Sequence, residues 1–599
     1  MWKKSVALGL CLVLFAALFG CSLSSAGETG QTQAPLSEEE QLYEMLFDIR
    51  NQVVLNLDMP AEELQKMQQD YENYDWNGSK SPIYRMGELT VSITTPAGKV
   101  YHYVLEEVGV RMKGNTSRTS FYSQEEGIYN AIHLKLSFQE TFDDADYYGA
   151  DAKTWTEEAR QARKNRTFAT LEKLDLRFNR CDDSSYLKEY FAYQTYRQYG
   201  VLAPMTNLCS FNWAGEHMGV YTINEPVDKI FLAKNLPEEA LGGDLYKVGW
   251  AGYANGSFTS TNSIGIENED TGEFYAYDLK TNKKTSTHES LKNLIKTLNG
   301  TSVSQEMFAQ LVDTQYLVNF AAVSYLLGNP DDMRNDYNNF YIYFRADNGQ
   351  MLLIPYDYDR CLGVTAHWNP TGDGVTSDNP FSDKLAATGE QQKNPLMLYS
   401  VVAGGYYVEE YAQKLQQILA GDWFTNENFA RLYAYAEANY AHLAQPSKAF
   451  YNTQGMYLDF DLERTSDFAS NGNISFREYL AAKTETVNFY LADMDRYAGG
   501  QTQNTSDWYI RADATNWQND PNFCMEQIQQ RVTIRLQVTG QMRLKVYHDK
   551  TGSWYGAECV DSGCTVPYES DGHTNIVLEK GVYRITLDLQ TMTIFLEKE

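Results

Sequence analysis

The segment from residue 329 to residue 363 constrains the fold more than any other part of the chain. Within it, residues 340–344 and 351–354 are runs of aromatic and aliphatic side chains, separated by Asp347-Asn348-Gly349. Such runs favour β-strands, and an Asn-Gly pair between two of them favours a tight turn. We therefore predict a β-hairpin here.

Acidic and amide side chains stand at both ends of this predicted hairpin. They are Asp331, Asp332, Asn338 and Asn339 before it, and Asp357 and Asp359 after it. A hairpin brings its ends together, so these groups should converge. Carboxylate and amide oxygens suit magnesium, and a further carboxylate can accept the proton of an attacking hydroxyl. The pattern predicts a phosphoryl-transfer site; the alternative is that the acids merely flank two strands of an acidic protein.

The segment resembles the signature of the CotH kinase family, whose P-[WY]-D-Y-D motif stands here as Pro355-Tyr356-Asp357-Tyr358-Asp359. Further matches follow in the family's order, and the resemblance spans roughly residues 105–365. They are VRMKGNTS at 110–117, the segment 171–204, GVYTINEPVD at 219–228 and DLYK at 244–247. The resemblance implies an α+β fold, with a two-lobed, atypical protein-kinase-like domain over residues 39–500 and a helical large lobe.

The resemblance also implies roles for the acids. Asp357 would be the principal metal ligand and Asp359 a second one, with Asn339 completing the metal shell. Asp331 would be the catalytic base. More residues separate Asp331 from Asn339 than separate the corresponding pair in protein kinases, so Asp332 and Asp336 remain alternative bases.

Phosphoryl transfer also needs cations that face the phosphates. By resemblance the small-lobe lysine is best assigned to Lys135, with Lys173 as its competitor, and Glu189 on the following helix would orient it. The ordinary alternatives are exposed strand lysines and a solvated helix carboxylate. The expected nucleotide-binding residues are Arg111, Lys113, Lys135, Glu189 and Glu225, and the implied cofactors are ATP with Mg²⁺ or Mn²⁺.

The N-terminus has the pattern of a lipoprotein signal. Two lysines precede an apolar run at 6–19, which is too short to span a membrane comfortably, and Leu18-Phe19-Gly20-Cys21 resembles a bacterial lipobox. We predict a signal peptide over 1–21, lipidation of Cys21, a flexible tether over 22–38 and a position on the extracytoplasmic face of the cell membrane. An uncleaved membrane anchor is the alternative.

The C-terminal residues 505–599 change to short apolar strands separated by turn signals, which predicts an all-β sandwich. WYIRADATNWQ resembles the opening of starch-binding and related modules, so Trp517 and Trp554 could stack on a polysaccharide. The alternative is that both pack inside the sandwich. Cys559 and Cys564 bracket a short loop and could pair.

Coarser patterns complete the expected layout. Helices are expected at 38–73, 184–199, 291–298, 304–312, 314–327 and within 393–497, strands at 89–94, 99–105, 108–112, 131–138, 171–178, 207–213 and 219–223, and a surface insertion at 251–287. With 599 residues, two or three domains are expected. The net charge of −29 argues against a nucleic-acid partner.

The sequence gives little support for other classes of enzyme. Residues 109–116 nearly spell a P-loop, but Asn115 replaces the required lysine, and neither G-x-G-x-x-G nor HExxH occurs. The sequence thus predicts an extracytoplasmic kinase acting on Ser or Thr of a surface or coat protein. The alternative is a non-catalytic surface or spore-coat assembly protein that binds glycans; a glycoside hydrolase has only the abundance of acids behind it.

Overall fold

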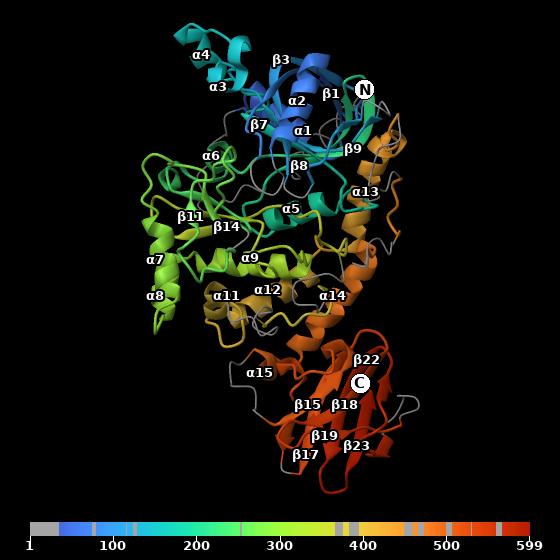
Figure 1. Ribbon diagram of the computed structural model, residues 1–599. Coiled ribbons are helices and arrows are strands. Elements are labelled where there is room, and N and C mark those ends of the chain that lie inside the picture. The colour runs from blue at the N-terminus through green and yellow to red at the C-terminus, as the bar shows by residue number, and fades with distance from the viewer. Residues whose placement is uncertain are drawn as a thin grey trace, which may run out of the picture.

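The computed structural model is shown in Figure 1. It describes residues 35–74, 80–114, 117–123, 128–251, 254–365, 375–382, 394–447, 459–464, 473–498, 506–528, 530–558 and 566–598. The predicted signal peptide, Cys21, most of the tether and the pair Cys559 and Cys564 lie outside these residues. Across the described residues, no helix is long and apolar enough to cross a membrane.

The N-terminal strands close into a barrel in the order β1-β2-β3-β6-β7-β9-β8. Their bounds are β1 Gln52–Asp58, β2 Arg85–Thr94, β3 Val100–Lys113, β6 His133–Ser137, β7 Lys173–Phe178, β8 Thr206–Trp213 and β9 Glu216–Asn224. The parallel pairing of β1 with β8 closes the ring. Alternate side chains such as Val53, Leu55 and Leu57 point into one apolar core, as the period-2 geometry of strands requires.

The sequence predicted helical spacing on both sides of a capped turn within 38–73, and this prediction was wrong at the turn. Helices α1 (Glu38–Phe47) and α2 (Ala61–Asn73) are present, but β1 lies between them. The strand alternates buried and less buried residues. The alternation of apolar and polar residues in QVVLNLD is the sequence pattern that indicates a strand here. The two strands expected at 99–105 and 108–112 form the single strand β3, with Glu107 in a left-handed conformation (φ 57°).

Below the barrel in Figure 1 lies a second unit, here called the helical body. Its sheet runs in the order β11-β12-β10-β13-β14 and shares a large apolar core with the surrounding helices. The strands are β10 Leu245–Val248, β11 Ile264–Gly265, β12 Tyr277–Leu279, β13 Phe340–Phe344 and β14 Met351–Pro355. The main helices are α5 Lys188–Gln198, α7 Glu289–Leu298, α8 Gln305–Leu311, α9 Thr314–Leu327, α11 Pro395–Ser400, α12 Val408–Ala420, α13 Asn426–Tyr440, α14 Phe476–Leu491 and α15 Met494–Tyr497.

Helix α9 runs through the middle of the helical body and was predicted with the bounds it has. The Asp313 side chain caps its first turn by accepting a hydrogen bond from the Tyr316 amide, and Gly328 (φ 56°) ends it in the left-handed conformation. Most of its side chains from Leu317 onward are buried. The helix therefore delivers the chain directly to the acidic segment that begins at Asp331.

The predicted hairpin is confirmed. Strand β13 pairs antiparallel with β14, with Phe340 opposite Pro355 and Phe344 opposite Met351. All ten residues of the two strands are buried, since the sheet is covered on both faces. Burial of both strands therefore fixes the position of the hairpin end at which Phe340 faces Pro355.

Several short elements were not anticipated. They are β4 Tyr122–Ser123, β5 Ile128–Tyr129, α3 Ala145–Tyr148, α4 Glu157–Lys164 and α6 Lys229–Asn235. The expected surface insertion at 251–287 contributes β11 and β12 to the central sheet, so part of it belongs to the body of the fold.

The C-terminal strands lie at the end of the molecule opposite the barrel (Figure 1). They are β15 Trp508–Ala512, β16 Glu526–Ile528, β17 Arg531–Val538, β18 Met542–His548, β19 Ser553–Tyr555, β20 Val566–Glu569, β21 Ile576–Leu578, β22 Gly581–Asp588 and β23 Thr593–Lys598. One sheet contains β15, β18, β19 and β21, the other β16, β17, β22, β23 and β20, and one apolar core joins them.

Candidate functional site

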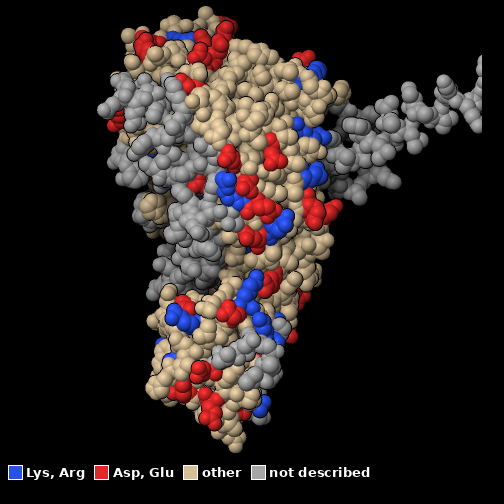
Figure 2. All heavy atoms as spheres, turned by 90° about the vertical axis from the view of Figure 1, so that its right-hand side faces the viewer, with Lys and Arg blue, Asp and Glu red and all other residues tan. Residues whose placement is uncertain are grey.

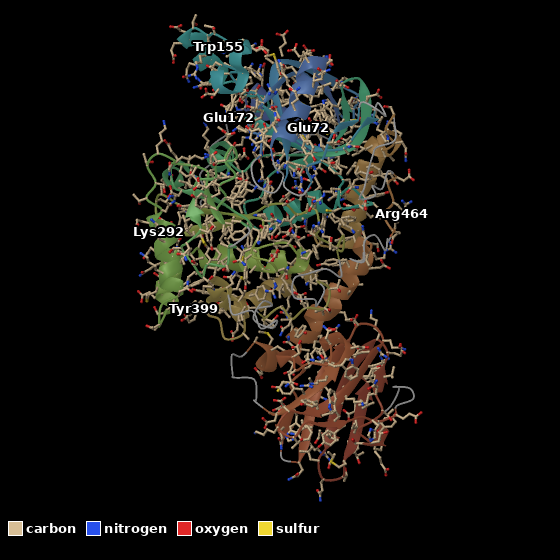
Figure 3. The ribbon with its side chains drawn as sticks, viewed as in Figure 1. Glu72, Trp155, Glu172, Lys292, Tyr399 and Arg464 are labelled. Carbon is tan, nitrogen blue, oxygen red and sulfur yellow. The ribbon has the colours of Figure 1, made fainter. Side chains whose placement is uncertain are left out.

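A cavity of about 1190 Å³ lies between the barrel and the helical body. Strands β3, β6 and β7 form its barrel side, and β10, the ends of the β13–β14 hairpin and residues 266–275 form the other side. Glu172, labelled in Figure 3, lies at the barrel, and Lys292 lies on α7 of the helical body. Most of the predicted site residues line this cavity, including Arg111, Lys135 and Asp357.

The two ends of the hairpin converge, as predicted. The Tyr356 amide donates to the carbonyl of Asn339 (3.2 Å), and the Asn339 side-chain amide donates to the carbonyl of Asp331 (2.9 Å). Asn339 and Asp357 both have positive φ, 55° and 60°. Non-glycine residues rarely adopt this conformation, which is often retained at functional sites. Both residues line the cavity.

Arg177, which was not among the predicted site residues, is the centre of the acidic cluster. Its guanidinium donates to Glu189 Oε1 (2.6 Å), to Asp359 Oδ2 (2.7 Å) and to Asp357. One buried cation therefore faces three carboxylates, which leaves a formal charge of about −2 on this group. Its strand is part of the segment that resembles the family, and the residue could have been noted there as a charge inside a buried strand.

The charges of the cluster shift the pKa values of its members. Burial would raise the pKa of Asp357, but Arg177, Lys113 and Lys247 lower it to about 2. Burial raises the pKa of Glu189 to about 7 against the pull of Arg177, and burial with the charge of Asp357 also raises the pKa of Asp359. Asp357 is therefore the carboxylate of this cluster whose charged form the surrounding cations favour most.

Glu189 does not orient Lys135 as expected, because its carboxylate accepts instead from Arg177, Tyr193 and Asn224. The lysine pairs with the barrel acid Asp175, at 4.0 Å from Oδ1 and therefore beyond hydrogen-bond distance.

Lys113 donates to the other Asp175 oxygen, Oδ2, which leaves Lys135 weakly compensated. Burial lowers the pKa of Lys135 to about 7, and the nearby cations Arg111 and Lys113 add to this effect against the attraction of Asp175. The competitor Lys173 also lines the cavity. Lys135 lines the cavity without a close ion pair and can therefore bind an anionic ligand when it is protonated.

Lys247 is a further cation that the sequence analysis did not assign. Its ammonium lies over the ring of Tyr356, 4.3 Å from the centroid, and it lines the cavity from strand β10. The residue ends the matched DLYK motif, and that match was the available signal. Cations therefore reach the cavity from both sides.

Arg111 is held by a loop from the helical body. Residues 266–275, between β11 and β12, form what we call the strap. Glu269 in the strap accepts from both terminal nitrogens of Arg111 (2.5 and 3.3 Å), and its carbonyl accepts from the Lys80 amide (2.7 Å). Asp270 accepts from the hydroxyl of Tyr74 (2.7 Å). The strap therefore crosses from the helical body to the barrel at the edge of the cavity.

The three candidate bases differ in their burial and in whether they line the cavity. Asp331 lines the cavity and accepts a hydrogen bond from the Asn338 side chain (2.8 Å), and burial raises its pKa to about 7. Asp336 also lines the cavity, and burial raises its pKa to about 6. Asp332 is only 1% exposed and accepts from the hydroxyls of Ser324 (2.6 Å) and Tyr358 (3.2 Å), so it organises the loop and is not a base.

Glu225 was expected in the nucleotide site, and this prediction was wrong. Its carboxylate accepts from the Tyr43 hydroxyl (2.8 Å), the Met205 amide (3.2 Å) and Lys234 (3.2 Å). It joins α1 to α6 in the interior and is not among the residues that line the cavity. The next residues, Pro226 and Val227, do line it.

The arrangement of the predicted metal ligands agrees with metal binding in one respect and not in another. No group of three or more His, Cys, Asp or Glu side chains is arranged for metal binding within the described residues. Asp357 and Asp359 nevertheless lie together, with the amide residue Asn339 at the same end of the hairpin. Hard oxygen donors from two carboxylates and one amide fit a divalent cation such as Mg²⁺ or Mn²⁺.

Comparison with known proteins agrees with the sequence signature. The family model described as "CotH kinase protein" matches residues 127–469, which is more than half of the chain. The chain belongs to the CotH kinase family, a family with kinase-like function, as its sequence predicted. Among curated protein sequences, none matches this chain.

Among solved structures, the crystal structure of the Helicobacter pylori proinflammatory kinase CtkA is similar over 45% of this chain and 88% of its own. The two sequences are 12% identical and the TM-score is 0.19. A score of that size does not support an argument about the shared fold.

Proposed function

We propose that this protein is an atypical protein kinase that transfers the γ-phosphoryl group of ATP to Ser or Thr hydroxyls, with Mg²⁺ or Mn²⁺ as its metal. The barrel would act as the small lobe and the helical body as the large lobe. The observation that carries this proposal is a single cavity in which lysines of β3, β6 and β10 meet the acids at both ends of the β13–β14 hairpin.

The chemistry assigns a part to each group. Lys113, Lys135 and Lys247 would bind the phosphates, while Asp357 and Asp359, with the amide of Asn339, would hold the metal. A bound divalent ion would neutralise charge that develops on the phosphates during transfer. Asp331, which must be deprotonated for this step, would accept the proton of the acceptor hydroxyl.

The acceptor oxygen forms a bond to the γ-phosphorus as the bond to the oxygen bridging the β- and γ-phosphates breaks, and ADP leaves. Arg177 would hold Asp357 and Asp359 in place through hydrogen bonds on the side of Glu189. It is therefore a positioning residue.

The test is the variant Asp357→Asn, with Asp347→Asn at the opposite end of the same hairpin as its matched control. Asp347 pairs with its neighbour Arg345 at the surface. We expect Asp357→Asn to lose about a hundredfold or more of labelled phosphate transfer, and the control to keep it. Full transfer by a folded Asp357→Asn protein would reject the metal assignment.

We further propose that the mature protein is a lipoprotein on the extracytoplasmic face of the membrane, and that its acceptor is a surface or coat protein. This rests on the sequence pattern that ends at Cys21. Replacing Cys21 with Ser should abolish labelling by a radioactive fatty acid and release the protein from the membrane fraction. Unchanged labelling would remove this proposal.

For the C-terminal residues we propose a β-sandwich that binds polysaccharide. Trp517 and Trp554 are half-buried and neither belongs to the core between the sheets. Their ring centroids lie 6.2 Å apart, and Tyr547 lies 4.7 Å from Trp554. Aromatic faces at a surface can stack on sugar rings. Affinity electrophoresis in soluble polysaccharides should show retardation that Trp554→Ala reduces, and unretarded wild-type protein would count against it.

The proposal includes no nucleic-acid partner. The net charge is −29, and on the face drawn in Figure 2 the described acidic and basic side chains lie close together in small groups. Nucleic-acid binding requires an extended positive surface.

A further inference from the structure

Trp250 is the most exposed large apolar side chain among the described residues, at 67% exposure. It follows strand β10 and lines the cavity. An indole left in water forgoes the free energy of burying its apolar surface, about 25 cal/mol for each Å². An exposed tryptophan at the rim of a polar cavity therefore contributes little to folding and requires another explanation.

The backbone around Trp250 is firmly held although its side chain is not covered. Its amide donates to Asn338 Oδ1 (3.1 Å), the Gly249 amide donates to the carbonyl of Ala276 (3.0 Å) and the Ala251 amide donates to that of Ala254 (3.0 Å). A fixed backbone with an exposed indole presents a preorganised surface, which lowers the entropy lost when a partner binds.

The same contacts place Trp250 beside the candidate base. Asn338 accepts from the Trp250 amide through its side-chain oxygen and donates to Asp331 Oδ1 through its nitrogen (2.8 Å). One amide group thus joins the two residues and keeps the Trp250 backbone within roughly 8 Å of the Asp331 carboxylate. That distance corresponds to two or three residues of extended chain, at about 3.3–3.6 Å each.

The position of Trp250 indicates which ligand it would contact: the acceptor polypeptide and not the adenine ring of ATP. In an in-line transfer the attacking hydroxyl and the leaving ADP stand on opposite sides of the transferred phosphorus. Asp331 contacts the attacking hydroxyl, so a residue tied to Asp331 lies on the acceptor's side. Ile266, at the start of the strap, is 37% exposed and also lines the cavity, which adds a second apolar group to its rim.

We propose that Trp250, assisted by Ile266, binds an aliphatic or aromatic side chain of the acceptor polypeptide, two or three residues away from the Ser or Thr that receives the phosphoryl group. This inference rests on the proposed kinase function. It makes Trp250 a specificity-determining residue for the acceptor and gives it no part in binding ATP.

The experiment uses the full-length protein and a synthetic peptide library with one fixed Ser and each flanking position varied between Ala and Leu or Phe. The wild-type protein should prefer the apolar residue at one or two positions by about tenfold in kcat/KM. Trp250→Ala should lose that preference with an unchanged Kd for Mg-ATP, and Trp250→Phe should keep most of it. Met307→Ala, which removes a 43% exposed side chain of α8 outside the cavity, should behave as wild type.

A second measurement does not depend on catalysis. The Leu- and Phe-containing library peptides and their Ala counterparts are titrated against wild type and Trp250→Ala by fluorescence anisotropy. Weaker binding in the variant supports the inference even if no phosphate is transferred, in which case only the kinase proposal fails. Equal peptide binding by both proteins, a wild-type library profile without preference, or a raised Kd for Mg-ATP in Trp250→Ala would each overturn it.

Discussion

The protonation of Lys135 depends on its burial between the barrel and the cavity. Burial and the neighbouring cations lower its pKa to about 7. A lysine must be protonated to bind a phosphate strongly, and its protonated fraction falls as the pH rises through about 7. We expect the Kd for Mg-ATP to rise above pH 7, by at most about tenfold for each pH unit.

Calorimetric titrations in buffers of different ionisation enthalpy measure this linkage, because binding above pH 7 should take up a proton. Lys135→Met should bind more weakly and without this dependence on pH. Lys173→Met is the matched control, since Lys173 is the competing lysine on the neighbouring strand. If Lys173→Met abolished the proton uptake and Lys135→Met did not, the two assignments would have to be exchanged.

The ion pairs of Arg177 lead to a prediction about the free energy of unfolding. Arg177→Met leaves Glu189, Asp357 and Asp359 together without their shared cation. Removing one partner of a buried ion pair typically costs about 3–5 kcal/mol, whereas Arg345→Met, at an exposed pair on the hairpin turn, should cost less than about 1 kcal/mol. Urea unfolding measures both. A similar small cost for the two variants would show that the cluster is not the buried network described here.

How much of the site the sequence could predict depends on the range of the interactions. Asp331, Asn339 and Asp357 were predictable because one short hairpin brings them together. Arg177 and Lys247 lie far in the chain from the acidic segment that they contact, so only their positions in the matched family segments pointed to them. Asp332 and Glu225 have suitable chemistry, but only tertiary packing decides that their carboxylates face the interior.

The strap is the element that joins the two units across the cavity. Its contacts with the barrel side run through Arg111, Lys80 and Tyr74. Glu269→Gln replaces the charged partner of Arg111 with a neutral one and weakens the strongest of these contacts. We expect faster hydrogen exchange of the amides of residues 266–275, measured by mass spectrometry, with little change elsewhere.

The matched control for the strap is Glu273→Gln. The Glu273 carboxylate accepts from the Tyr275 hydroxyl within the strap itself. If both variants left the exchange of 266–275 unchanged, the ion pair to Arg111 would not hold the strap. Selective acceleration in Glu269→Gln would show that this one charge holds the strap against the barrel side.

At the scale of elements, local signals decided which predictions held. The hairpin and α9 carry their own turn and capping residues, so their bounds followed from the sequence. Strand β1 lies between two helices and pairs with β2 and with the distant β8, so its short alternation was interpreted as the turn between those helices. The barrel depends on that strand, and its closure was therefore not predictable.

The apolar cores of the molecule differ in whether they border the cavity. The cavity is shared by the barrel and the helical body, whereas the C-terminal sheets have a core of their own. The contacts that join those sheets to α14 and α15 include Arg535 with Phe489, Tyr497 with Arg535 and Lys580 with Glu485. A ligand in the cavity should therefore stabilise the first two units together and leave the C-terminal unit nearly unaffected.

Differential scanning calorimetry tests this expectation. A ligand that binds only the folded state stabilises it by about 2.7 kcal/mol at a concentration of 100 Kd, so Mg-ATP or Mn-ATP should raise the midpoint of one transition by a few degrees. A second transition, assigned to residues 506–598 because the core substitution Ile534→Ala lowers it selectively, should not move. Asp357→Asn should abolish the metal-dependent part of the shift. One transition that moves as a whole would mean that the C-terminal sheets unfold together with the catalytic units, and no shift in wild type would favour the non-catalytic binding protein.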